Sequence, residues 1–251
     1  MFAVRIMSLY QKILSNKQAN KKMFAILIDP DKQNSEVLIS TIKKANNANV
    51  DLFFVGGSLL RHDSLDKCLT TIKEYSKIPV ILFPGNTMQV NKKADGILFL
   101  SLISGRNAEM LIGKQVISAP ILKESKLEVI PTGYMLIDSG TPTTVSYMSN
   151  TTPIPNDKDD VSACTAMAGE MLGLKTIFMD GGSGAKKPIS TNMINSVSKV
   201  INTPLIIGGG IDSAEKAAAN CKAGADIIVV GNAIEKDKML INNIAEAIHA
   251  L

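Results

Sequence analysis

The sequence contains no tryptophan, and aromatic residues make up only 4% of its 251 residues. Proteins that hold single-stranded nucleic acid stack the bases on aromatic side chains. The shortage of such side chains therefore argues against nucleic acid as a partner. The net charge of +4 comes from 27 Lys and Arg against 23 Asp and Glu. This mild excess is that of an ordinary surface, which favours anionic substrates and allows at most peripheral contact with an anionic membrane.

Cysteine and histidine are also scarce. Cys68, Cys164 and Cys221 lie far apart, and no Cys-x-x-Cys pair occurs. Each falls on the apolar side of a helical pattern, so we expect three buried thiols in a reducing cytosol rather than a disulfide framework or a zinc site. The two histidines, His62 and His249, are expected at the solvated surface rather than in a catalytic role.

Long apolar runs are missing as well. No run reaches the roughly 20 residues that a membrane-spanning helix needs. Arg5, Gln11 and Lys12 interrupt the segment where an export signal would need an unbroken apolar stretch. Hydrophobic residues nevertheless make up 45% of the chain and charged residues 20%, which is enough for a sizeable core. The simplest prediction is a cytoplasmic protein.

Eight short apolar runs dominate the rest of the pattern, and each has the composition of a buried parallel strand. Helical patterns separate most of them, as parallel strands require. The pattern predicts a (β/α)₈ TIM barrel spanning residues 1–251 as one domain, with a capping helix at about 1–20; an open doubly wound sheet is the alternative. The runs lie at residues 23–28, 51–55, 80–83, 97–100, 127–130 (perhaps extended by 134–137) and around Ile177, Ile206 and Ile228.

Two connections break this alternation. The segment between Phe83 and Ile97 is too short for a crossover helix with its loops, so the third helix should be shortened or missing and leave an apolar groove. Residues 139–160 are rich in Ser, Thr, Pro, Asn and Asp, and we expect a lid or mobile loop on the face where barrel active sites are built. A helix should start near Asn107 and stop near Pro120. Ser35 should cap a helix whose apolar stripe is Val37, Leu38, Thr41, Ile42 and Ala45.

Three stretches end an apolar run in glycine, at residues 176–185, 204–211 and 226–233. Strands that end in this way and lead into helix starts converge backbone amides on one point, and helix N-termini carry roughly +0.5 charge. We therefore expect a phosphorylated small molecule at this end of the barrel. Plain tight turns are the alternative interpretation of these glycines.

Three polar side chains should lie at the same mouth. Asp29 and Ser58 follow the first two strand-like runs, and Mg²⁺ is commonly held by one or two protein oxygens together with substrate phosphates. The alternative for Asp29 is a helix cap within a common turn. Asp180 suits a general base or a hydrogen-bonding partner for a substrate hydroxyl, or else a turn residue that satisfies nearby amides.

Eight motifs occur in a fixed order between Met23 and Ala233. They are Leu27-Ile28-Asp29-Pro30-Asp31-Lys32, Val55-Gly56-Gly57-Ser58, Phe83-Pro84-Gly85-Asn86, Ser104-Gly105-Arg106-Asn107, Ile130-Pro131-Thr132-Gly133-Tyr134, Gly181-Gly182-Ser183-Gly184-Ala185, Gly208-Gly209-Gly210-Ile211 and Val230-Gly231-Asn232-Ala233. This ordered set resembles the geranylgeranylglyceryl phosphate synthase family, in particular its larger group of archaeal and bacterial members. The resemblance covers nearly the whole chain.

The resemblance implies a Mg²⁺-dependent prenyltransferase of phospholipid biosynthesis on a modified barrel. Such enzymes join the 3-hydroxyl of sn-glycerol 1-phosphate to C1 of a polyprenyl diphosphate, here expected to be geranylgeranyl diphosphate, and release diphosphate. The groove left by the missing helix would receive the prenyl chain, since each buried CH₂ contributes about 0.8 kcal/mol. The resemblance also implies a homo-oligomer.

Roles carry over with the resemblance. Asp29 and Ser58 would bind the Mg²⁺, and Asp180 would be the catalytic residue that orients the attacking hydroxyl and takes its proton. The family usually has Tyr-Leu-Glu where this chain has Phe178-Met179-Asp180, so a phenolic hydroxyl and one methylene are missing. The glycerol phosphate would be held by Phe178, Met179, Asp180, Gly181, Gly182, Ser183, Gly184, Gly209, Gly210, Gly231 and Asn232.

Three other functions fit the residues apart from the resemblance. A sugar-phosphate isomerase would use Asp29 with a second carboxylate as an acid and base pair and need no metal. A flavin-binding oxidoreductase would share the last two glycine motifs. A phosphometabolite sensor would keep the phosphate site without the chemistry.

Overall fold

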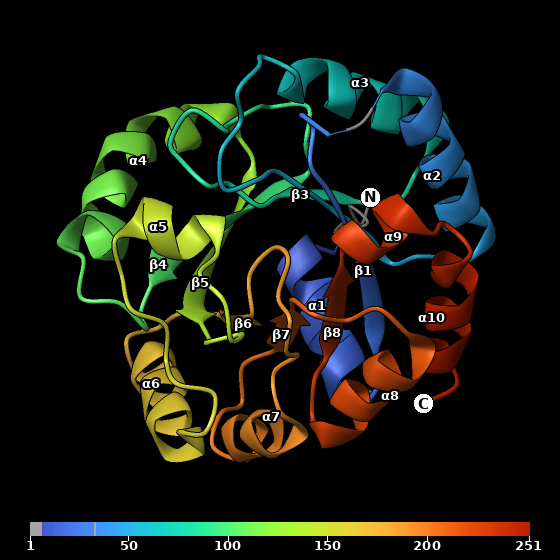
Figure 1. Ribbon diagram of the computed structural model, residues 1–251. Coiled ribbons are helices and arrows are strands. Elements are labelled where there is room, and N and C mark those ends of the chain that lie inside the picture. The colour runs from blue at the N-terminus through green and yellow to red at the C-terminus, as the bar shows by residue number, and fades with distance from the viewer. Residues whose placement is uncertain (1–6, 33) are drawn as a thin grey trace, which may run out of the picture.

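Eight parallel strands form one closed barrel in chain order, with β8 paired to β1 (Figure 1). The computed structural model describes residues 7–32 and 34–251. The predicted TIM barrel is confirmed. The strands are β1 (Met23–Ile28), β2 (Leu52–Val55), β3 (Val80–Leu82), β4 (Gly96–Leu102), β5 (Glu128–Leu136), β6 (Thr176–Asp180), β7 (Leu205–Gly208) and β8 (Ile227–Val230).

Helices form a ring around the barrel, and Figure 1 shows one gap in their alternation with the strands, after β3. Residues 83–95, which the structure describes completely, contain no helix. This agrees with the prediction that the connection after the third strand is too short for a crossover helix. None of the helices in the described ranges is long and apolar enough to cross a membrane. The helices are α1 (Leu9–Gln18), α2 (Ser35–Asn47), α3 (Leu65–Tyr75), the π-helix η1 (Glu109–Gly113), α4 (Lys114–Ser125), α5 (Thr144–Ser149), α6 (Asp159–Met171), α7 (Thr191–Ser198), α8 (Ala214–Ala223), α9 (Asn232–Lys236) and α10 (Leu240–His249).

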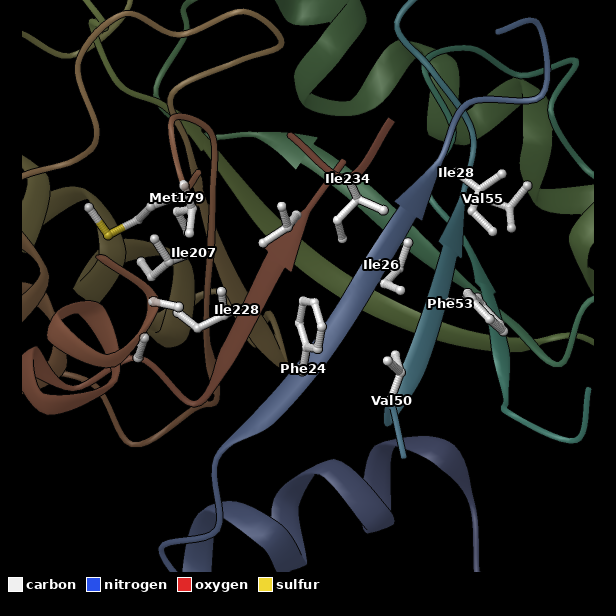
Figure 2. Close-up of a cluster of buried hydrophobic side chains, with 14 of the residues drawn as sticks. Phe24, Ile26, Ile28, Val50, Phe53, Val55, Met179, Ile207, Ile228 and Ile234 are labelled. Atoms are coloured by element: carbon white, nitrogen blue, oxygen red, sulfur yellow. The ribbon is translucent and has the colours of Figure 1, made fainter. Parts of the chain in front are cut away.

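The core has two layers because successive side chains of a strand point to opposite faces. On β1, Phe24, Ile26 and Ile28 belong to the outer cluster, between the barrel and the helices (Figure 2). Met23 and Ala25 belong to the inner cluster, which fills the barrel. All five are at most 1% exposed. Both faces of each strand are therefore buried, which explains the continuous apolar runs in the sequence.

Helix α1 closes the N-terminal end of the barrel, where Ile13 joins the inner cluster. The Glu128 carboxylate on β5 accepts hydrogen bonds from the amides of Leu9 and Tyr10, at 2.6 and 2.8 Å. It thus satisfies two of the amides that a helix start leaves without partners. The capping helix was predicted at about residues 1–20, and α1 begins at Leu9 in the structure. Residues 1–6 of the predicted range lie outside the described part of the chain.

Three local predictions were wrong. Helix α4 continues through Pro120, an exposed residue, to Ser125. The amide that proline lacks removes one hydrogen bond of the helix without ending it. Asn34 rather than Ser35 caps α2, with its side chain accepting the Val37 amide at 2.8 Å. Cys164 is exposed.

The predicted lid is an ordered segment rather than an irregular loop. It contains α5, whose start is capped by Thr143 in a capping box with Ser146. Beyond α5 the chain returns to the sheet, where Ile154 forms a parallel bridge with Ile137. The segment therefore lies over the C-terminal ends of β4 and β5, as Figure 1 shows for α5.

Candidate active site

A cavity of about 650 Å³ opens at the C-terminal ends of the strands. It has a polar mouth and an apolar arm that extends toward β4 and α4. The carboxyl ends of all eight strands meet at this face, which is where TIM barrels build their active sites. The structure brings eleven of the thirteen predicted site residues to its lining: Asp29, Ser58, Phe178, Asp180, Gly182, Ser183, Gly184, Gly209, Gly210, Gly231 and Asn232.

The other two predicted site residues, Met179 and Gly181, do not line the cavity. Met179 is fully buried in the outer cluster, where Figure 2 shows its side chain. It lies between Phe178 and Asp180 on β6, and the alternation of strand side chains points it away from the barrel interior. The Gly181 amide donates to the carbonyl of Gly208 at 3.0 Å, so it extends the sheet and does not face a ligand.

The glycine side of the mouth presents free backbone amides. Those of Ser183, Gly184, Gly209 and Gly210 donate no hydrogen bond to another residue in the described part of the chain. Gly209 has φ +87°, and a Cβ there would lie 2.7 Å from the Gly181 nitrogen, so no larger residue fits. The short helix α9 begins just beyond β8. Loops after the seventh and eighth strands with a short extra helix are the usual phosphate site of TIM barrels.

Asp180 is the last residue of β6, and its carboxylate accepts two hydrogen bonds. Its carboxylate accepts the Tyr134 hydroxyl at 2.7 Å and the Gly182 amide at 2.7 Å. Burial raises the pKa of Asp180 above its ordinary 3.8, and the two hydrogen bonds oppose that rise. Burial also raises the pKa of Tyr134 well above 10.0, and the Asp180 charge adds to this effect. The phenol therefore stays protonated, and its hydrogen bond holds the Asp180 carboxylate in place.

Tyr134 was assigned no role from the sequence. It lies opposite Phe178 in the register of β5 and β6, so it supplies a phenolic hydroxyl near the position where Phe178 lacks one. The ring of Phe178 stacks on Phe83 at a centroid distance of 4.9 Å and contacts Tyr134 edge-on at 5.7 Å. Phe178 thus contributes an apolar floor to the mouth rather than a hydrogen bond.

Asp29 and Ser58 line the opposite side of the mouth. The side chain of Asp29 is 17% exposed and lies 3.4 Å from the ammonium of Lys32. Lys32 also donates to the Asn232 side chain at 3.1 Å, and Asn232 donates to the Ser183 hydroxyl at 2.9 Å. This chain of contacts joins the carboxylate side of the mouth to the glycine side.

The residues present are compatible with a bound Mg²⁺. Within the described ranges, no three His, Cys, Asp or Glu side chains gather as a metal cluster. Mg²⁺ does not need one, since it binds through one or two protein oxygens when phosphates supply the rest. A Cβ at Gly57 would lie 3.3 Å from both Asp29 carboxylate oxygens, so the glycine leaves the space around them open. Asp29 and Ser58 both line the cavity, and each carries a hard oxygen donor.

Gln89 holds the two loops that build this side, and sequence reasoning missed it. Its side chain is 3% exposed; it accepts the amides of Gly57 at 3.3 Å and Gly85 at 3.2 Å and donates to the Gly57 carbonyl at 2.8 Å. The loops touch closely, because a Cβ at Gly85 would lie 2.3 Å from the Gly57 carbonyl oxygen. Gln89 therefore sets the backbone beside Ser58 where the missing helix would otherwise support it. The only sequence signal was a polar residue in a segment too short for a helix.

The other arm of the cavity is mainly apolar. Residues from the helix-free connection after β3, from β4 and from α4 form its walls, so it follows the gap that the missing helix leaves. The apolar lining residues of this arm that belong to the outer cluster or pack against it are Val90, Ile97, Phe99 and Leu122. Phe83, Leu98, Leu100, Leu102 and Met110 also line the cavity, and they belong to the inner cluster or pack against it. Val145 and Met148 of the lid segment close it from above.

Together, the glycine loops with free amides, the carboxylate side and the apolar arm define a TIM barrel whose cavity has both polar and apolar walls. Residues 16–248 match the model of the PcrB family. The chain belongs to this family.

Several similar proteins are named geranylgeranylglyceryl phosphate synthase. A protein of Chitinophaga pinensis named geranylgeranylglyceryl phosphate synthase is 57% identical over 242 residues, which cover 96% of each chain. One from Pyrococcus horikoshii with the same name is 39% identical over 92% of this chain and 90% of its own. The crystal structure of (S)-3-O-geranylgeranylglyceryl phosphate synthase from Thermoplasma acidophilum in complex with sn-glycerol-1-phosphate has a TM-score of 0.93 at 30% identity, covering 98% of this chain and 100% of its own.

Replacing Gln89 should loosen the loops after β2 and β3. In a Gln89→Met variant, two amides and one carbonyl lose their partner while the side-chain length is kept. Leaving buried polar groups unpaired costs about 1–3 kcal/mol each, partly offset by water, so we expect the free energy of unfolding to fall by about 2–4 kcal/mol. Urea denaturation measures this. Met88→Leu, at the neighbouring residue with 89% exposure, is the control and should change little. Equal stability of the two variants would contradict the role of Gln89.

The raised pKa of Asp180 predicts a pH-dependent stability difference. An acid whose pKa rises on folding contributes stability that is present below its ordinary pKa and lost as the pH rises through the folded pKa. An Asp180→Asn variant does not carry the buried charge, so its melting temperature should exceed that of the wild type at pH 7. The gap should shrink as the pH falls toward 3.8. Asp157→Asn, at an exposed side chain, should show no such trend in melting curves from pH 4 to 8. A gap independent of pH would overturn the assignment.

Proposed function

We propose that this protein is a prenyltransferase that joins sn-glycerol 1-phosphate to a polyprenyl diphosphate, with geranylgeranyl diphosphate as the expected donor. The observation that carries the proposal is one cavity with an anion site, a carboxylate side and an apolar arm. The relatives' name and the glycerol phosphate in the Thermoplasma complex support the same reaction. A sugar-phosphate isomerase would have no use for the apolar arm.

The glycerol phosphate is placed on the glycine side. Its phosphate accepts the free amides of Ser183, Gly184, Gly209 and Gly210, where α9 also begins. Its 3-hydroxyl then lies toward Asp180 at the end of β6. Because Tyr134 and Gly182 already hold the Asp180 carboxylate, the carboxylate is oriented before the substrate arrives.

The bond changes follow from this placement. The 3-hydroxyl oxygen bonds to C1 of the prenyl group, the bond from C1 to the diphosphate oxygen breaks, and its electron pair leaves with the diphosphate. The hydroxyl proton passes to Asp180. The raised pKa of Asp180 makes it a better proton acceptor than an ordinary aspartate.

Asp29 and Ser58 are proposed to hold Mg²⁺ together with the diphosphate. A bound Mg²⁺ offsets the negative charge that develops on the departing diphosphate. Lys32 lies 3.4 Å from Asp29 and adds a second positive charge on this side. Gln89 keeps the backbone of Gly57 and Ser58 in place for these contacts.

The prenyl chain is proposed to enter the apolar arm between the helix-free connection and α4. Val90, Ile97 and Leu122 line this arm, and each buried CH₂ contributes about 0.8 kcal/mol. A long chain therefore binds without specific polar contacts.

The reaction can be tested directly. The protein is incubated with Mg²⁺, labelled sn-glycerol 1-phosphate and a mixture of prenyl diphosphates, and the butanol extract is analysed by mass spectrometry. We expect a prenylglyceryl phosphate whose mass also reports the preferred chain length. No product with any chain length would refute the proposal. Binding of glycerol phosphate in calorimetry without turnover would instead identify a phosphometabolite-binding protein.

The proposed metal site predicts that activity falls when the Asp29 carboxylate is replaced by an amide. Asp29→Asn keeps the size of the side chain but removes its charge, so turnover should fall by on the order of 100-fold and more Mg²⁺ should be needed for half-maximal rate. Initial rates over a Mg²⁺ titration measure both. Asp63→Asn, at an exposed residue outside the cavity lining, is the matched control. A wild-type Mg²⁺ profile for Asp29→Asn would remove Asp29 from the metal site.

A further inference from the structure

Arg61 lies on the loop after β2 and lines the cavity, yet the contacts described so far give it no role. Its side chain is 69% exposed. In the part of the chain that the structure describes, its guanidinium donates no hydrogen bond, and the carboxylate nearest to it is that of Asp31, at 4.0 Å from Nε. Because a guanidinium presents several N–H donors in a planar fork, most of this group is available to a ligand.

The backbone at Arg61 is fixed, although its side chain is free. Asp31, whose side chain is 4% exposed, accepts a hydrogen bond from the Arg61 amide and another from the Ser64 hydroxyl, the latter at 2.7 Å. Gln89 holds the other end of the same loop through the backbone of Gly57. The loop after β2 is thus attached at both ends, so the backbone that carries the guanidinium is in place before a ligand binds.

Arg61 lies at the outer edge of the carboxylate side of the mouth. Ser58 and Leu59, on the same loop, also line the cavity, and Ser58 is one of the two residues proposed to hold Mg²⁺. The Cα atoms of Ser58 and Arg61 are at most about 11 Å apart, because only three residues of chain join them. The side chain of Asp29 is 17% exposed, far less than that of Arg61. An anion held at Asp29 and Ser58 therefore has its outward end toward Arg61.

The charges on this side distinguish Arg61 from Lys32. The Lys32 ammonium is shared by two carboxylates, at 3.4 Å from Asp29 and 3.9 Å from Glu235. The Asp31 carboxylate beside Arg61 is already hydrogen-bonded to an amide and a hydroxyl, and it is nearly buried. Arg61 is therefore the less compensated of the two cations. A guanidinium also donates two parallel hydrogen bonds to one phosphate, which an ammonium does not.

We propose that Arg61 binds the terminal phosphate of the prenyl diphosphate, the one that is not bonded to C1. This inference rests on the proposed function and adds a specificity-determining residue to it. Mg²⁺ at Asp29 and Ser58 meets the diphosphate deeper in the mouth, and the guanidinium meets its outer phosphate. A monophosphate held in the same place has no second phosphate to reach Arg61. The residue therefore makes the site select diphosphates over monophosphates.

Binding of inorganic diphosphate to the full-length protein in the presence of Mg²⁺ tests the proposal without any turnover. In titration calorimetry, Arg61→Gln should weaken this binding by on the order of 10- to 100-fold, because a charged hydrogen-bond donor is lost. Binding of inorganic phosphate and of sn-glycerol 1-phosphate should stay unchanged, and the latter also reports that the variant is folded. Wild-type affinity of Arg61→Gln for diphosphate, or a wild type that binds no diphosphate, would overturn the proposal.

Two further variants separate specific recognition from a general effect of charge. Lys67→Gln removes the same charge from an exposed position on α3, outside the cavity lining, and should leave diphosphate binding unchanged. Equal weakening by Lys67→Gln would count against a contact at Arg61. Arg61→Lys keeps the charge but loses the planar fork, so it should recover only part of the affinity. Full recovery would exclude recognition through two parallel hydrogen bonds.

Steady-state kinetics provide a second measurement. With geranylgeranyl diphosphate as the donor, Arg61→Gln should raise the KM for the donor by about 10-fold or more and leave the KM for sn-glycerol 1-phosphate unchanged. A rise in both KM values would indicate a distorted mouth and contradict the proposal. The two possible failures are distinguishable. If diphosphate binds through Arg61 but no prenyl donor reacts, the proposed function fails and the assignment of Arg61 to a diphosphate stands. If the wild type is active and Arg61→Gln has the same kinetic parameters, only the assignment of Arg61 fails.

Discussion

The pairing of β8 with β1 is the contact on which the candidate site depends. It closes the barrel, and its register sets Ile26 opposite Val230. Asp29, just beyond β1, and Gly231, just beyond β8, are thereby brought to neighbouring positions although some 200 residues separate them in the chain. A Cβ at Gly231 would lie 3.3 Å from the side chain of Leu27, which shows how closely the two strand ends pack. Without this closure, the carboxylate side and the glycine side would be the two edges of an open sheet.

The gap after β3 has two effects on the site. It opens the apolar arm, and it removes the helix that would support the loops after β2 and β3. A single buried amide, that of Gln89, takes over part of this support through three hydrogen bonds. On the other side of the apolar arm, α4 is attached to the barrel by Gln115, whose side chain donates to the carbonyls of Leu100 and Met110.

Local patterns were enough to predict the barrel and most of the mouth. Buried parallel strands are apolar on both faces, and glycines after strands keep amides free, so both are visible over a few residues. Met179 shows a limit that the pattern itself could have revealed, since strand alternation turns it away from its neighbours Phe178 and Asp180. The predictions at Pro120 and Cys164 failed because they depended on which side of each helix meets solvent. The contact of Tyr134 with Asp180 depends on strand register, and the role of Gln89 depends on how two loops pack. A local sequence pattern predicts neither of them.

Lys32 compensates acidic side chains at the mouth before any metal ion or diphosphate binds. Its ammonium lies 3.4 Å from Asp29 and 3.9 Å from Glu235, so the protein itself already compensates part of the acidic charge there. A bare divalent cation would have to compete with this internal cation. A cation already bound to a diphosphate brings its own counter-charge, and Lys32 can turn to that anion. Under the proposed function, the mouth is therefore better matched to a metal ion that arrives with its diphosphate than to a free metal ion.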